Sequence, residues 1–75
     1  MASVGATPAK QAVGRTLRLT RHKLGLSQTE FACHYGISVA PLRDWEQGRR
    51  TPSAMALAYI KVITAHPKLV QKAVA

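Results

Sequence analysis

The chain has 75 residues, enough for one small domain with a limited hydrophobic core. Eleven Lys and Arg residues oppose three acidic residues, so the formal net charge is +8, which points to a polyanionic partner or a membrane surface. The single cysteine, Cys33, excludes an intramolecular disulfide and a cysteine-rich zinc site.

Residues 1–8 are small and polar, without the apolar core of a secretory signal, and no segment approaches the roughly 18 apolar residues of a membrane span. We therefore expect a cytoplasmic protein of a bacterial, phage or archaeal host, without a membrane partner. In that reduced environment we interpret Cys33 as a partly buried small hydrophobe, with a redox-sensing thiol as the alternative.

The first predicted helix covers residues 10–23 and follows an arm of residues 1–9. We expect this arm to be flexible, with entry into the minor groove of DNA, as in some helix-turn-helix proteins, as the alternative. Gly25 ends this helix. On its basic side we interpret Arg15 as solvated, whereas Arg18 either is solvated or contacts a phosphate group. The side chains that we expect to face the core repeat at spacings of four and seven residues, and they are Val13, Leu17 and Leu24.

Two helix starts, at Ser27 and Ser38, lie eleven residues apart with a glycine between them. Ser27 and Glu30 have the spacing of a capping box, and Ser38 is expected to cap its helix in a weaker form of the same arrangement. Gly36 can adopt the left-handed conformation that ends the first of these helices. The arrangement predicts a helix-turn-helix over about residues 27–47, of the kind that reads DNA.

Ser53 can cap a further helix that runs to about Ala65. Because apolar side chains such as Met55 and Tyr59 cover more than one side of this helix, one small core cannot bury them all. Our hypothesis is a homodimer that forms through this helix and the C-terminal tail of residues 67–75, with a stable monomer as the alternative. The side chains expected in the core of the protomer are Leu57, Ile60 and either Ile63 or Val62.

Five residues of the motif stand at the spacing of one known family: polar Gln28, small Ala32, Gly36, and apolar Leu42 and Trp45. In these residues the motif resembles the Cro/CI (XRE) helix-turn-helix family. The sequence WEQGRRTP, which follows, resembles the compact HigA-type antitoxin branch. The resemblance covers about residues 17–67 and implies an all-α, lambda-repressor-like bundle of four to five short helices within residues 10–75.

The same resemblance implies roles for particular residues. Gln28 would contact a phosphate group, and residues 38–44 would face the major groove. Arg21 and Glu46 would form an ion pair between the first and third helices, with two separately solvated charges as the alternative.

The second motif helix has a sparse reading surface. Val39, Ala40 and Pro41 offer only apolar contact, for example to a thymine methyl group. Arg43 can donate two hydrogen bonds to a guanine and is the leading base-reading residue, with a phosphate contact as the alternative. Asp44 either accepts from a cytosine amino group or orients Arg43.

Phosphate contacts are expected around the motif and in the loop that follows it, because such contacts position a protein on the duplex. The predicted phosphate ligands are Gln28, Ser38, Gln47, Arg49, Arg50 and Thr51, with Arg21 and Arg18 as further candidates.

No catalytic, metal or cofactor site is predicted, because His22, His34 and His66 are scattered without a carboxylate at metal-ligand spacing. We expect a sequence-specific regulator that binds double-stranded DNA, a repressor that occupies a palindromic operator as a dimer. The alternative is an antitoxin that binds a toxin protein and autoregulates its operon. RNA binding by charge alone is a weaker alternative, since stacking aromatic residues are few.

Overall fold

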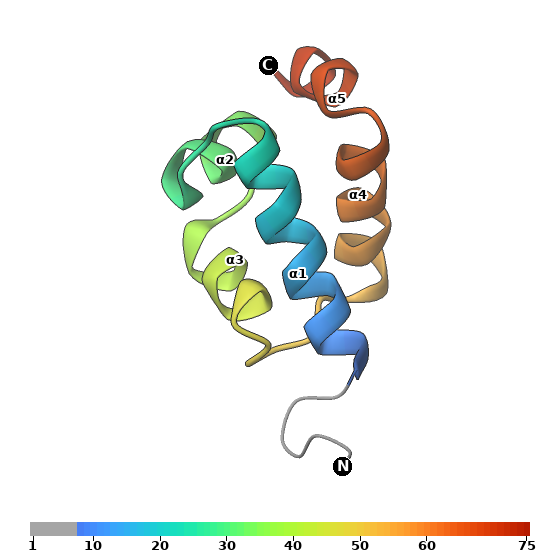
Figure 1. The fold of residues 1–75 in the computed structure, drawn as a ribbon. Helices are drawn as coiled ribbons and strands as arrows, with labels where there is room; N and C mark the ends of the chain where they lie inside the picture. The colour runs from blue at the N-terminus through green and yellow to red at the C-terminus, as the bar shows by residue number, and fades with distance from the viewer. Residues whose placement is uncertain (1–7) are drawn as a thin grey trace.

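A computed structural model describes residues 8–75, with side chains from residue 11 onward. Five helices follow one another along the chain (Figure 1): α1 (Pro8–Lys23), α2 (Gln28–Tyr35), α3 (Val39–Glu46), α4 (Ala54–Ala65) and α5 (Pro67–Val74). No strand occurs within residues 8–75, so the predicted all-α bundle is confirmed. Helix α1 begins two residues before its predicted start, and residues 1–7 of the predicted arm lie outside the described residues.

The start and end of α2 have the local structure that the sequence predicts. Ser27 Oγ accepts from the Glu30 amide at 3.0 Å, and Glu30 Oε1 accepts from the Ser27 amide at 2.8 Å. At the other end Gly36 has φ 66°, and the Ile37 amide donates to the Ala32 carbonyl at 2.9 Å. The capping box fixes where α2 begins, and the left-handed glycine turns the chain toward α3.

The side chain of Ser38 makes no capping hydrogen bond, so that part of the prediction is wrong. In α2 and α4 the capping serine accepts from the amide three residues later, as Ser53 does from Ala56. The equivalent residue of α3 is Pro41, which has no amide hydrogen to donate. The hydroxyl of Ser38, exposed at the start of α3, therefore remains available to another partner.

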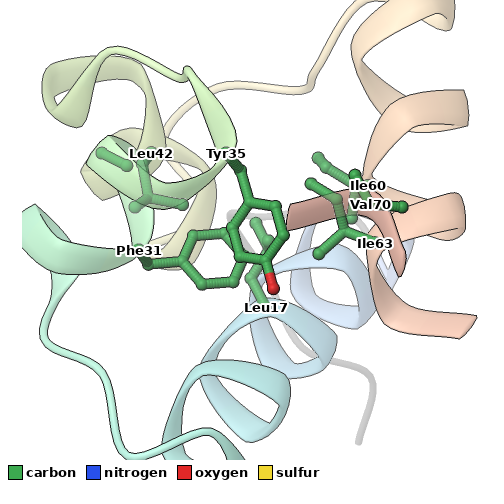
Figure 2. Close-up of a cluster of buried hydrophobic side chains, with 8 residues drawn as sticks. Leu17, Phe31, Tyr35, Leu42, Ile60, Ile63 and Val70 are labelled. Carbon is green, nitrogen blue, oxygen red and sulfur yellow. The ribbon is translucent and has the colours of Figure 1, made fainter. Parts of the chain in front are cut away.

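One hydrophobic core joins all five helices (Figure 2). Its centre is the aromatic pair of Phe31 and Tyr35, whose ring centroids lie 4.7 Å apart. Burial of this apolar surface, rather than any polar contact, is the main force that holds the bundle together. The fully or almost fully buried members are Leu17, Phe31, Ala32, Tyr35, Leu42, Ile60, Ile63 and Val70.

The structure decides two predictions about which side chains are buried. On α4 the core takes Ile63 and not Val62, whose side chain is 49% exposed. Cys33 is exposed, so the prediction of partial burial is wrong. The reason is rotation along α2: residues 31, 32 and 35 face the core, which leaves Cys33 on the opposite side.

Helix α1 lies between α3 and α4, and α2 packs against α3 and α5 (Figure 1). The approach of α1 to the end of α3 is close. A Cβ atom added at Gly14 would lie 2.8 Å from the carbonyl oxygens of both Trp45 and Glu46. Gly14 thus permits the contact that places the basic flank of α1 beside the end of the second motif helix. Over the described part of the chain, no helix combines the length and apolar character that a bilayer span requires.

Candidate nucleic-acid interface

A buried carboxylate joins the three helices of this surface. The Glu46 side chain is only 2% exposed, and it accepts from Arg21 Nε and Nη2 at 2.9 Å each. Gln28 Nε2 donates to Glu46 Oε1 at 3.1 Å, and Arg21 Nη1 donates to the Leu26 carbonyl at 3.1 Å. The hydrogen bond to Glu46 raises the pKa of Arg21 above its ordinary value, against the opposite effect of burial. The ion pair that the resemblance implied is confirmed.

The contact of Gln28 with Glu46 leaves this glutamine able to bind a further group. A primary amide carries two N–H donors, and one of them is used by the carboxylate. Its side chain is half-buried at the first turn of α2, where the helix dipole favours an anion.

A polar cleft opens between α1, the start of α2 and the end of α3, with a volume of about 690 Å³. Three arginines and one carboxylate, that of Glu46, line it, so its charge is positive. The Arg18 guanidinium donates to the Glu46 carbonyl, which holds it at the end of α3. The other side chains that line the cleft are Gln11, Arg15, Arg21, Gln28 and Gln47.

Arg15 was predicted to be solvated and Gln11 was given no role, yet both side chains line this cleft. Their spacing contains the signal that was missed. Gln11, Arg15 and Arg18 lie four and three residues apart, so they share one face of a helix with Arg21, three residues further on.

The outward face of α3 consists of Ala40 and Arg43, and Gln47, the residue directly after the helix, continues it. All three are exposed, at spacings of three and four residues. Val39 was expected to offer its side chain to a thymine methyl group. It is instead half-buried and packs against the hydrophobic core. Pro41 is also half-buried. The exposed polar group in the middle of this face is therefore the guanidinium of Arg43.

Asp44 is not paired with the residue that sequence interpretation assigned to it. Its carboxylate lies 3.7 Å from Arg49 Nη1 and 4.0 Å from Arg50 Nη1, whereas no ion pair with Arg43 is present among the described residues. The interpretation that Asp44 orients Arg43 is therefore wrong. Both loop arginines are about 70% exposed, and exposed pairs of this length contribute little free energy. They can exchange Asp44 for a phosphate group at small cost.

No group of three or more His, Cys, Asp and Glu side chains that could hold a metal ion occurs in the described part of the chain. The chemistry that the surface offers consists of guanidinium, amide and hydroxyl donors around the exposed face of α3.

Comparison with known proteins places this arrangement in a family context. Residues 12–62 match the helix-turn-helix domain family. The chain is 39% identical over 49 residues to the uncharacterized HTH-type transcriptional regulator YiaG of Escherichia coli (strain K12), a match that covers 65% of this chain and 51% of YiaG. The chain thus spans about half the length of the curated relatives it matches.

Two solved structures are similar over most of the fold. The crystal structure of an XRE-family-like protein from Agrobacterium tumefaciens is 40% identical, with a TM-score of 0.76 over 80% of this chain and 97% of that one. The clp gene regulator ClgR from C. glutamicum is 25% identical, with a TM-score of 0.67 over 84% of this chain and 81% of that one.

Proposed function

Because this chain belongs to the helix-turn-helix domain family and is of the XRE type, we propose that it binds double-stranded DNA in a sequence-specific manner and regulates transcription. The observation that carries this proposal is the exposed face of α3 centred on Arg43. On one side lie Arg15 and Arg18, which form no ion pair among the described residues, and on the other lie Arg49 and Arg50, whose pairs with Asp44 are long and exposed. Repression by a dimer on a palindromic operator is the form of regulation that we propose.

In this proposal α3 lies in the major groove. Arg43 donates to the O6 and N7 atoms of a guanine, and Ala40 and Pro41 supply apolar contact to a thymine methyl group. Val39 contributes less than a fully exposed residue would, since part of its side chain packs against the core. Asp44 remains a candidate acceptor for a cytosine amino group once Arg49 and Arg50 engage phosphates.

The phosphate contacts come from two places around α3. Arg49, Arg50 and Thr51 are exposed in the loop that follows α3, and Ser38 at its start has a hydroxyl that makes no capping bond. On the side of α3 that borders the polar cleft, four predicted phosphate ligands have N–H donors close to the end of α3. They are Arg18, Arg21, Gln28 and Gln47.

The dimer would form through α4 and α5. Met55 is 84% exposed and Val62 49% exposed, seven residues apart on one side of α4, and on α5 Leu69 is 66% and Val74 47% exposed. Exposed apolar side chains on two helices that pack against each other are typical of a protein interface. A two-fold axis through this surface would present two copies of α3 to successive half-sites.

The test of DNA reading is an unbiased selection of duplex DNA by the purified protein, followed by binding at several salt concentrations. We expect a palindrome with guanine in both half-sites. With about six phosphate contacts per dimer, log affinity should fall with log salt at a slope of about −5. Salt-sensitive binding without an enriched sequence would contradict base reading, and a slope close to zero would contradict the electrostatic account as well.

The test of the dimer is sedimentation equilibrium at micromolar concentration. A species of 8.1 kDa alone would contradict the proposed dimer. The antitoxin alternative uses the same exposed apolar surface for a toxin protein, and it stays a prediction that a pull-down of a stable partner would favour.

A further inference from the structure

Two arginines on the basic flank of α1 have no carboxylate to neutralise them. Arg15 and Arg18 are exposed, and no ion pair of either residue occurs within the described part of the chain. The carboxylate of the cleft, Glu46, is almost fully buried and already accepts from Arg21 and Gln28. Two uncompensated positive charges therefore face the same cleft.

The donors around these charges are of the kind that binds an oxyanion. A guanidinium carries five N–H donors in a planar fork, which suits bidentate contact with phosphate. Arg18 donates from Nη1 to the carbonyl of Glu46, which places its guanidinium beside the cleft and leaves its other N–H groups available. Gln11 and Gln47 add primary amides on the walls of the same cleft, and a volume of about 690 Å³ is ample for a phosphate group.

We propose that this cleft is a phosphate-binding site in which Arg15 and Arg18 are the charged ligands and Gln11 and Gln47 are hydrogen-bond donors. Arg15 and Gln11 extend the binding surface along α1, beyond the helix-turn-helix itself. The phosphate group belongs either to the DNA backbone or to a free phosphorylated compound. The first source rests on the proposed DNA-binding function, and the second does not.

The experiment uses one double variant and one matched control. The variant, Arg15→Gln with Arg18→Gln, removes both charges from the cleft. The control, Lys23→Gln with Lys61→Gln, removes two charges from exposed positions at the end of α1 and on the α1-facing side of α4, outside the cleft lining. Because the two proteins have equal net charge, any difference between them reports the local site and not the overall field. Far-UV circular dichroism checks that both proteins are folded.

In the first arm, inorganic pyrophosphate is titrated at constant ionic strength, and backbone amide and arginine Nε–Hε signals are followed by NMR. We expect saturable shifts at Gln11, Arg15, Arg18 and Gln47, and binding about tenfold weaker in the arginine variant but unchanged in the lysine control. In the second arm, DNA affinity is measured against salt. We expect the slope to become shallower by about 0.9 for each phosphate group that the arginine variant no longer binds.

The outcomes distinguish the two sources of phosphate. If the arginine variant has a shallower salt dependence of DNA binding but unchanged pyrophosphate binding, the site is supported and its ligand is the DNA backbone. A pyrophosphate effect without a change in slope supports it with a free phosphorylated compound. If neither arm separates the arginine variant from the lysine control, the proposal is overturned. If the unmodified protein binds no DNA, the proposed function fails, and the pyrophosphate arm alone decides the cleft.

Discussion

The protein has a recognition side, made by the flank of α1, by α2, by α3 and by residues 49–51, and an apolar side made by α4 and α5. On the recognition side a carboxylate that is 2% exposed accepts three hydrogen bonds from Arg21 and Gln28. On the apolar side Met55 and Leu69 are more than half exposed. Buried charge of this kind positions groups more than it stabilises a fold, whereas exposed apolar area indicates a surface that a partner can cover.

The largest effect on the recognition side is expected at Glu46, because its carboxylate is almost fully buried. In Glu46→Ala the guanidinium of Arg21, only 13% exposed, loses both carboxylate hydrogen bonds, and we expect the free energy of unfolding to fall by about 3 kcal/mol. Urea denaturation measures the change. The double variant Arg21→Met with Glu46→Leu should recover most of it, because two apolar side chains leave no orphan charge. A loss below about 1 kcal/mol would mean that the pair behaves like an exposed one.

On the recognition side, substitutions of Arg43 and of Arg49 are expected to have different effects on DNA binding. Arg43→Ala should weaken binding to the selected sequence by about 1–3 kcal/mol and relax its preference for guanine. Arg49→Ala is the matched control, since removal of a phosphate ligand weakens binding to all sequences alike. Competition binding with the selected duplex and a scrambled duplex separates them. Equal weakening of both duplexes by Arg43→Ala would assign Arg43 to a phosphate.

The sequence predicted those parts of the molecule that depend on neighbours along the chain. The capping box of Ser27 and Glu30 and the left-handed turn at Gly36 are local, and both are present. The hydroxyl of Ser38 failed as a cap for a reason that is also local, since Pro41 stands where the donor amide is needed.

Contacts that depend on how the helices pack against one another could not be predicted from neighbours along the chain. The placement of Arg15 on the cleft depends on the close approach of α1 to α3, which needs Gly14. The partners of Asp44 depend on the path of the loop, which brings back Arg49 and Arg50. The Arg21–Glu46 pair was accessible only through a family resemblance, because nothing in the spacing of two distant charges predicts their contact.

The helix contact that supports the recognition side can be tested at Gly14. In Gly14→Ala the new methyl group would lie 2.8 Å from two carbonyl oxygens, so α1 and α3 must separate. Overpacking costs about 1–3 kcal/mol, and the better helix propensity of alanine returns about 1 kcal/mol, so we expect a net loss of about 1 kcal/mol. DNA affinity should fall with it as the cleft widens. His22→Ala, on the exposed side of the same helix, should change neither property.

Tyrosine hydroxyls attach the apolar side to the motif. Tyr59 donates to the Tyr35 carbonyl at the end of α2 at 2.6 Å, and Tyr35 donates to the Pro67 carbonyl at the start of α5 at 2.9 Å. Tyr59→Phe should lower the free energy of unfolding by about 1 kcal/mol, and Tyr35→Phe by a similar amount. Chemical denaturation measures both, and if neither variant is less stable, apolar packing alone attaches α4 and α5.

Burial raises the pKa of both phenols above the ordinary value of 10.0. Stability linked to these two groups is therefore complete below pH 10 and is lost as the pH rises toward and through the higher pKa of the folded state. The alkaline loss should be smaller in the phenylalanine variants than in the unmodified protein, because the substituted ring has no proton to release.

The smallest predicted effect concerns the exposed capping box, which orders the recognition side without buried charge. Hydrogen bonds from the Ser27 backbone and side chain lower the pKa of Glu30 below its ordinary value of 4.5. Because the folded-state pKa is the lower one, the contribution of this carboxylate is complete above 4.5 and is lost as the pH falls through the folded pKa. Thermal unfolding of the unmodified protein and of Glu30→Gln, measured between about pH 6 and pH 3, should therefore differ most at the upper end and converge at the lower end. A difference that stays constant over this range would show that the Glu30 side chain acts through its uncharged geometry, and that the start of α2 owes nothing to the carboxylate charge.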